Sequence, residues 1–165
     1  TKQVWENILR DDYDNWDVPT LQEEYNAYKQ DNPLPYKELI FPDVLKVLNE
    51  VKSRGLKIGL ASSSVKADIL RALKENHLDG FFDVVLSGEE FKESKPNPEI
   101  YLTALNQLGV KPNQALIIED SEKGIAAGVA AGVGVWAIKD NRFGMNQGAA
   151  KGLLDNLIDV LDLLE

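Results

Sequence analysis

From residue 42 to the end of the chain, short apolar segments alternate with segments of helical period, and this alternation limits the possible folds more than any other feature. The apolar segments have the length of strands and cover residues 56–61, 82–87, 114–119 and 133–138. The segments of helical period cover residues 42–55, 65–77, 97–109, 121–132 and 156–164. Strands and helices in this order form right-handed βαβ units, whose parallel sheet is covered by helices on both faces. The sequence therefore predicts an α/β fold with a Rossmann-like parallel sheet.

The beginning of the chain follows a different pattern. Apolar residues recur at helical spacing over residues 3–10 and 20–30. The stretch from Asp31 to Pro35 contains two prolines and breaks this pattern. We therefore expect a domain boundary near this stretch, with a small helical unit over residues 1–38 and the α/β unit over residues 39–165.

The composition limits the classes of partner. The chain has 165 residues, of which 44% are hydrophobic and 27% charged, as is usual for a soluble globular protein. Its net charge of −9 argues against nucleic acid or an anionic membrane as the main partner, because both repel an acidic surface. Cysteine is absent from the sequence, which excludes thiolate chemistry, and no apolar run is long enough to cross a bilayer. We expect a cytoplasmic protein.

Polar residues follow the strands at the positions where α/β proteins bind ligands. Ser62, Ser63 and Ser64 follow the first strand, Lys95 lies in the loop after the second, and Glu119 and Asp120 end the third. The carboxyl ends of parallel strands meet at one edge of a sheet. Serine hydroxyls at a helix start, together with a lysine, suit a phosphate group, and the two carboxylates suit Mg²⁺. Two adjacent carboxylates at the end of a buried strand also need a positive partner, which this Mg²⁺ could be.

Each of these residues also has a purely structural interpretation. Ser64 could cap the helix that follows it, and Lys95 could be a solvated loop lysine. Glu119 and Asp120 could interact with the positive end of the next helix without binding a ligand. Gly124 is the first of three glycines spaced four residues apart in the predicted helix over residues 121–132. This spacing favours close packing of the helix on the sheet. Three such groups at three successive strand ends favour a shared site over these separate interpretations.

The motifs resemble those of the haloacid-dehalogenase-like hydrolases. The resemblance rests on ASSS after the first strand, on SKPNPEIY, and on IIEDSEKGIAAGVAAG, in this order. Within that family it extends to the branch of β-phosphoglucomutase and small sugar-phosphate phosphatases, and it covers the chain from Pro42 to the end. It implies a Rossmann-like core over residues 39–165 and places residues 1–38 in a small helical cap domain.

The resemblance also implies a role for each matching residue. Ser62 would bind the transferring phosphoryl group together with Ser63, and Lys95 would neutralise the charge of that group. Asp120 would be the more direct ligand of Mg²⁺, with Glu119 beside it. Two further residues match positions that contact a second, distal phosphate in the mutase-like members, and these are Ser64 and Lys66.

One motif of the family is missing from this sequence. The family carries its nucleophile in an Asp-x-Asp-Gly motif directly after its first strand, and no such motif occurs here. The sequence Asp12-Tyr13-Asp14 lacks the glycine and follows a predicted helix, so we do not expect it to supply the nucleophile. The resemblance predicts that the chain begins inside the cap. The family's first strand would lie between the strands that end at Ser62 and Glu119, so we expect a gap there.

The resemblance implies a Mg²⁺-dependent phosphoryl-transfer enzyme that acts on a small phosphorylated metabolite, with a sugar phosphate favoured, through an aspartyl-phosphate intermediate. Whether the enzyme is a phosphatase or a mutase stays open. The intact protein is expected to be a monomer, and residues 1–165 alone are expected to be inactive. The alternative is a domain or fragment that binds phosphate and Mg²⁺ without turnover. A dehalogenase is less favoured, because its chemistry does not use the Mg²⁺ that the Glu119-Asp120 pair suits.

Overall fold

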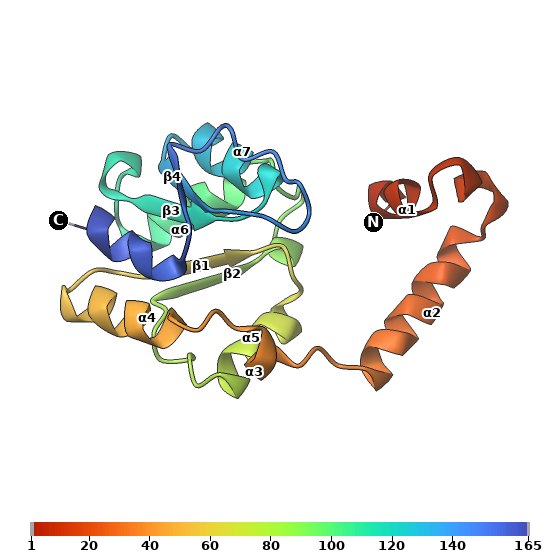
Figure 1. Ribbon diagram of the computed structural model, residues 1–165, viewed down its shortest axis with the longest axis horizontal. Coiled ribbons are helices and arrows are strands. Elements are labelled where there is room, and N and C mark those ends of the chain that lie inside the picture. The colour runs from red at the N-terminus through yellow and green to blue at the C-terminus, as the bar shows by residue number, and fades with distance from the viewer. Residues whose placement is uncertain (1, 165) are drawn as a thin grey trace. The chain divides into compact units, whose positions relative to one another are not determined.

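The computed structural model describes residues 2–164, without the side chains of residues 2–4 and 7 (Figure 1). The described chain forms two compact units, one up to Pro35 and one from Tyr36 onward. None of the described helices is long and apolar enough to cross a membrane.

The first unit is helical. It contains α1 (Lys2–Leu9), the 3-10 helix η1 (Arg10–Asn15) and α2 (Val18–Asp31). The indole nitrogen of Trp5 donates a hydrogen bond of 2.9 Å to Gln22, and its ring meets that of Tyr25 edge to face at 6.1 Å. These contacts join α1 to α2, and both predicted helices are confirmed. Asp12 and Asp14 lie within η1, which follows α1 and not a strand along the chain.

The second unit alternates strands and helices as the sequence predicts. Its strands are β1 (Gly59–Ser62), β2 (Val84–Ser87), β3 (Leu116–Glu119), β4 (Gly134–Ile138) and β5 (Gly152–Leu154). Its α-helices are α3 (Tyr36–Leu39), α4 (Val44–Ser53), α5 (Lys66–Glu75), α6 (Glu99–Leu108) and α7 (Glu122–Ala130). Its 3-10 helices are η2 (Gly88–Glu90), η3 (Pro112–Gln114) and η4 (Leu157–Leu163).

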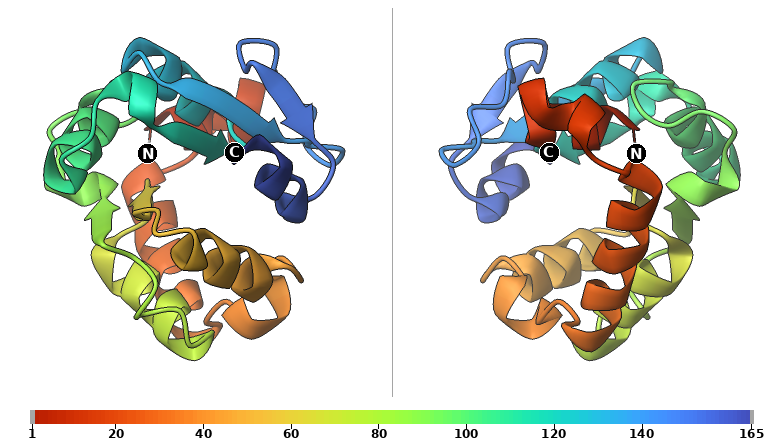
Figure 2. Two further views of the ribbon diagram at one scale, coloured as in Figure 1. Left: turned by 90° about the vertical axis from the view of Figure 1, so that its left-hand side faces the viewer. Right: turned by 90° about the vertical axis from the view of Figure 1, so that its right-hand side faces the viewer.

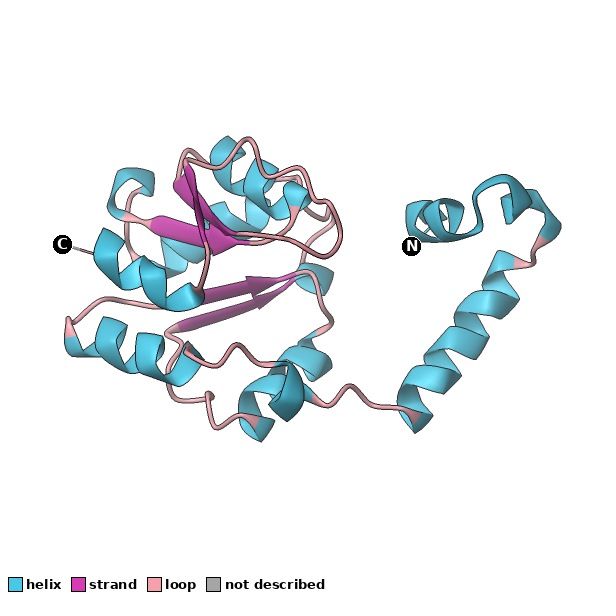
Figure 3. Ribbon diagram, viewed as in Figure 1, coloured by secondary structure: helices cyan, strands magenta, loops and turns pink. Residues whose placement is uncertain are grey.

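The strands form two parallel sheets and not one continuous sheet (Figure 3). In the first sheet β1 pairs with β2, and Ser62 lies opposite Ser87. In the second sheet the order is β3-β4-β5, and Glu119 lies opposite Ala137. The strand β5 was not predicted, and the predicted helix over residues 156–164 is a 3-10 helix. The expected gap is present, because among residues 2–164 β1 pairs only with β2 and β3 pairs only with β4.

Helices cover both faces of the strands, and Figure 2 shows these layers from the side. On one face, α6 and α7 pack on the strands through a core that includes Leu86, Tyr101, Leu105 and Ala127. This core contains residues of both sheets, so α6 helps to hold the two sheets together. On the other face, α4 packs on η4 and on the second sheet, and α4 and α5 pack beside the first sheet. The predicted α/β architecture is thereby confirmed.

A large cleft lies between the two sheets. It has a volume of about 1580 Å³ and is lined by residues of both β1 and β3. Side chains of α4, α6 and η4 complete its walls, and most of them are apolar. The carboxyl ends of β1 and β3 bring Ser62 and Glu119 to the same end of this cleft.

Candidate active site

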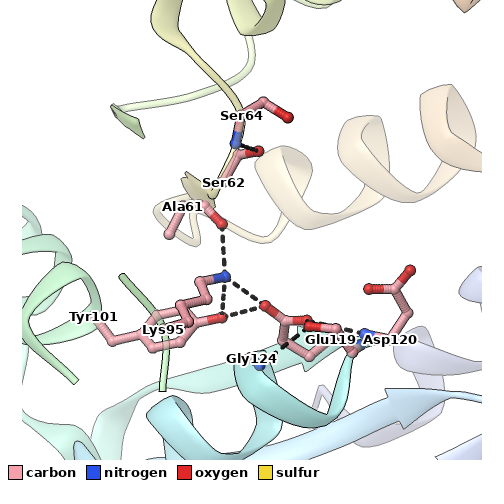
Figure 4. A network of polar contacts seen from close by, with 9 residues as sticks. Ala61, Ser62, Ser64, Lys95, Tyr101, Glu119, Asp120 and Gly124 are labelled. Carbon is pink, nitrogen blue, oxygen red and sulfur yellow. Dashed lines mark hydrogen bonds and ion pairs between the residues drawn. The ribbon is translucent and has the colours of Figure 1, made fainter. Parts of the chain in front are cut away.

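Lys95 connects the two sheets at the carboxyl ends of β1 and β3 (Figure 4). Its ammonium donates to the backbone carbonyl of Ala61 at 3.1 Å, to the hydroxyl of Tyr101 at 2.9 Å and to Oε1 of Glu119 at 2.5 Å. Only 7% of its side chain is exposed. Three acceptors match the three donors of an ammonium group, so Lys95 is fixed in place and is not a solvated loop residue.

Glu119 has hydrogen-bond partners on both of its carboxylate oxygens. Oε1 accepts from Lys95 and, at 2.6 Å, from the hydroxyl of Tyr101. Oε2 accepts from the backbone N–H groups of Asp120 and Ser121 and from the hydroxyl of Ser121, at 3.0–3.3 Å. The carboxylate lies against the first turn of α7, where a β-carbon at Gly124 would come within 2.0 Å of its Cδ. Gly124 is therefore required by the position of Glu119.

The charge state of Glu119 follows from these contacts. Burial alone would raise the pKa of this carboxyl group. The charge of Lys95, with hydrogen bonds from Lys95, Tyr101 and Ser121, outweighs burial and lowers the pKa below its ordinary value. The positive partner that the Glu119-Asp120 pair needs is thus Lys95, which compensates Glu119 directly.

Tyr101 completes the network around Lys95. Its hydroxyl accepts from Lys95 and donates to Glu119, and the Lys95 ammonium lies 4.7 Å from the centre of its ring. Burial, followed by the nearby carboxylate of Glu119, raises the pKa of Tyr101 far above its ordinary value. The phenol therefore stays protonated and acts as a permanent donor to Glu119. A role for Tyr101 could not be predicted from the sequence, because an aromatic residue on the apolar face of a helix is usually part of the core.

Asp120 differs from its neighbour in exposure and contacts. The residue is exposed, and its carboxylate makes no hydrogen bond or ion pair among residues 2–164. Its backbone carbonyl accepts from the buried side chain of Gln147 at 2.8 Å. In the part of the chain that the structure describes, no three His, Cys, Asp or Glu side chains converge on a possible metal position. These residues thus supply one open carboxylate for Mg²⁺, which needs several oxygen ligands.

The serines after β1 form a turn at the end of the cleft. The hydroxyl of Ser62 accepts from the backbone N–H of Ser64 at 3.1 Å, and Ser63 is exposed. Ser62 also lines the cleft into which Lys95 and Asp120 face. The hydroxyl hydrogen of Ser62 can still be donated to a ligand, because the oxygen only accepts in its contact with Ser64.

Ser64 and Lys66 have other partners. The backbone carbonyl of Ser64 accepts from the hydroxyl of Ser87 at 2.7 Å. Val65, and not Ser64, occupies the N-cap position of α5, without a side-chain cap hydrogen bond. The ammonium of Lys66 donates to Glu90 at 2.8 Å and to the carbonyl of Val85 at 2.6 Å. The backbone N–H of Lys66 donates to Glu89, so a carboxylate already occupies the start of α5. These contacts fix η2 against α5 and do not favour the distal phosphate site.

The loop after β4 is organised by two buried polar side chains. The carboxylate of Asp140 accepts from the backbone N–H groups of three loop residues, Arg142, Phe143 and Met145. The amide of Gln147 donates to the carbonyls of Asp120 and Ile138 and accepts from the N–H of Asp140. Gln147 thus holds the backbone of Asp120 against the end of β4. Nothing in its sequence context distinguishes Gln147 from an ordinary surface glutamine.

Comparison with known proteins gives a consistent assignment. The model of a family described as haloacid dehalogenase-like hydrolase matches residues 1–138. The chain is similar to the pyrophosphatase PpaX of Bacillus cereus, with 30% identity over 162 residues, which cover 94% of this chain and 74% of that protein. It is also similar to a phosphorylated carbohydrates phosphatase of Thermotoga maritima, with 39% identity over 92 residues, which cover 56% of this chain and 43% of that protein.

A solved structure shares the fold. This is CbbY from Rhodobacter sphaeroides in complex with phosphate, with 28% identity and a TM-score of 0.64. The match covers 70% of this chain and 53% of that one. The matched part therefore spans about half of CbbY, less than half of the Thermotoga phosphatase and about three quarters of the Bacillus pyrophosphatase.

Proposed function

Because this chain belongs to the haloacid dehalogenase-like hydrolase family, we propose that it acts in phosphoryl transfer from a small phosphorylated metabolite. The single observation that supports this best is the buried ammonium of Lys95 at the carboxyl ends of β1 and β3. Its position beside Ser62, at the end of a large cleft, suits the oxygens of a phosphoryl group. A sugar phosphate is the favoured class of substrate, and pyrophosphate is the other class that the names of similar proteins suggest.

The residues at the end of the cleft have different proposed roles. Lys95 neutralises the charge that develops on the phosphoryl oxygens, and Ser62 donates a hydrogen bond to the same group, with Ser63 beside it. Asp120 is the open carboxylate that would hold Mg²⁺. The cation, when bound, supplies further positive charge toward the phosphoryl oxygens.

The nucleophile is proposed to come from a strand seated in the cleft. The facing edges of β1 and β3 pair with no strand among the described residues, and an extended segment there could pair with both. An aspartate at the carboxyl end of such a strand would lie near Lys95 and Ser62. Attack of its carboxylate on phosphorus would form an aspartyl-phosphate and release the substrate's oxygen leaving group. Water would then cleave this intermediate in a phosphatase, whereas a sugar hydroxyl would do so in a mutase.

A second candidate function is binding of phosphate and Mg²⁺ without turnover. The observation that favours it is the position of Asp12 and Asp14 in η1, because no aspartate pair follows a strand end at the cleft in the described chain. Turnover by residues 1–165 alone would exclude this candidate.

The proposal is tested by binding of inorganic phosphate to the chain, measured by ³¹P NMR or calorimetry. The Lys95→Ala variant should lose phosphate binding, because the ammonium is the main positive group at this end of the cleft. The matched control is Lys66→Ala, which removes a lysine already paired with Glu90 and should bind phosphate as the wild type does. Equal affinity of both variants, or a wild-type chain that binds no phosphate, would contradict the proposed role of Lys95.

A further inference from the structure

Glu119 is better suited to holding Lys95 than to binding a metal. A carboxylate has about four lone-pair positions. Glu119 accepts from five donor groups, two on Oε1 and three on Oε2, and 9% of its side chain is exposed. These donors use the acceptor capacity of the Glu119 carboxylate, whereas the neighbouring carboxylate of Asp120 is exposed and has no partner among the described residues.

Among the side chains that the structure describes, Tyr101 is the one that contacts both Lys95 and Glu119 through a single atom. Its hydroxyl oxygen accepts from the ammonium at 2.9 Å while its hydrogen is donated to Glu119 at 2.6 Å. Tyr101 comes from α6, Glu119 ends β3, and Lys95 reaches across to the carbonyl of Ala61 in β1. Two side chains and one backbone carbonyl, from three separate elements, therefore fix the ammonium (Figure 4).

We propose that Glu119 and Tyr101 are positioning residues, which hold the Lys95 ammonium at the phosphoryl site, and that Asp120 alone of the adjacent carboxylates is available to a cation. The role at a phosphoryl site rests on the proposed function, whereas the positioning of Lys95 does not. Without the Tyr101 hydroxyl, the ammonium loses one of its three acceptors and Glu119 loses a donor. Lys95 should then leave its place between the sheets for part of the time.

The positioning is tested by acetylation of lysines in residues 1–165, followed by mass spectrometry of each lysine. Lys95 should react slowly in the wild type because it is buried. Tyr101→Phe and Glu119→Gln should each raise its labelling by about tenfold or more, the factor expected for loss of one hydrogen bond to a charged group. The matched control is Asp120→Asn, which removes the next carboxylate along the chain and should leave the labelling of Lys95 unchanged.

Two comparisons within the same data make the result specific. Lys66 and Lys139 should react at wild-type rates in Tyr101→Phe, because a variant that merely loosens the fold would expose all lysines. Inorganic phosphate should protect Lys95 in the wild type and protect it less in Tyr101→Phe, while the labelling of Lys66 should not respond to phosphate.

Unchanged labelling of Lys95 in Tyr101→Phe or Glu119→Gln, or increased labelling in Asp120→Asn, would overturn the positioning role. Faster labelling in these two variants without any protection by phosphate would leave the positioning intact and contradict the proposed function.

Discussion

At the scale of single residues, the position of the Glu119 carboxylate depends on the absence of a side chain at Gly124. Because a β-carbon there would overlap the Glu119 carboxylate, Gly124→Ala should displace Glu119 and break its buried ion pair with Lys95. We expect a loss of about 3–5 kcal/mol in the free energy of unfolding, as for other disrupted buried ion pairs. Urea denaturation measures this loss. Gly80→Ala is the matched control, since a β-carbon at Gly80 meets nothing within 4 Å. Equal stabilities of Gly124→Ala and Gly80→Ala would show that the Glu119 carboxylate does not need the space beside Gly124.

The lowered pKa of Glu119 predicts a dependence of stability on pH. In the unfolded chain the carboxyl group has a pKa of about 4.3, and in the folded chain the pKa is lower. The ionised form therefore stabilises the fold fully above about pH 4.3, and this contribution is lost as the pH falls through the folded pKa. The pKa values of Asp83, Glu90 and Asp140 are also lowered, so the variant Glu119→Gln must be compared with the wild type.

The wild-type free energy of unfolding should accordingly fall more steeply below about pH 4.3 than that of Glu119→Gln. Urea denaturation at a series of pH values measures both curves. Parallel curves for the two proteins would mean that Glu119 titrates alike in the folded and unfolded chains.

At the scale of elements, the loop after β4 depends on Gln147. Gln147→Ala would leave the carbonyls of Asp120 and Ile138 and the N–H of Asp140 without their partner. We expect a loss of about 1–3 kcal/mol in stability, the usual cost of buried polar groups left unsatisfied. Amide hydrogen exchange at Asp140 should also become faster. Asn141→Ala, at an exposed position of the same loop, should change neither quantity, and an equal effect of both variants would contradict the role of Gln147.

The elements that the sequence predicts well are those with a strong period. The four strands from β1 to β4 and the helices between them follow from short apolar runs and amphipathic segments. The strand β5 was missed because its three residues give no alternation that could be recognised. The roles of Tyr101 and Gln147 depend on contacts between distant segments, and a core aromatic or a surface glutamine looks the same in sequence. The contacts of Lys66 could not be predicted for the same reason, because its partners Glu89 and Glu90 resemble solvated loop residues.

At the scale of the whole molecule, the cleft between β1 and β3 leaves apolar walls and unpaired strand edges together. Such edges favour self-association, so residues 1–165 alone should bind a dye specific for exposed apolar surface and should associate in solution. The chain alone should also hydrolyse no p-nitrophenyl phosphate. Chromatography, dye fluorescence and a colorimetric assay test these expectations. A monomer with a cooperative melt and turnover would place the nucleophile within this chain, where Asp12 and Asp14 would have to be reconsidered.

Binding of Mg²⁺ by the chain as a whole should be weak, because the described residues offer one open carboxylate and this makes an incomplete site. Calorimetry on residues 1–165 should show weak binding or none, and Asp120→Asn should abolish whatever binding is found. Glu119→Gln should leave it unchanged. Tight, saturable binding to this chain would contradict the set of ligands that we infer.

The proposed action of Lys95 on the transferring phosphoryl group is best tested by turnover of the catalytically active protein. The kcat of Lys95→Ala with a phosphorylated substrate should fall by about 10²–10³-fold, the usual loss when one group that stabilises transition-state charge is removed. In Lys66→Ala the lost side chain is a partner of Glu90 and Val85, so kcat should stay near the wild-type value. Small and equal effects of the two substitutions on kcat would contradict the account.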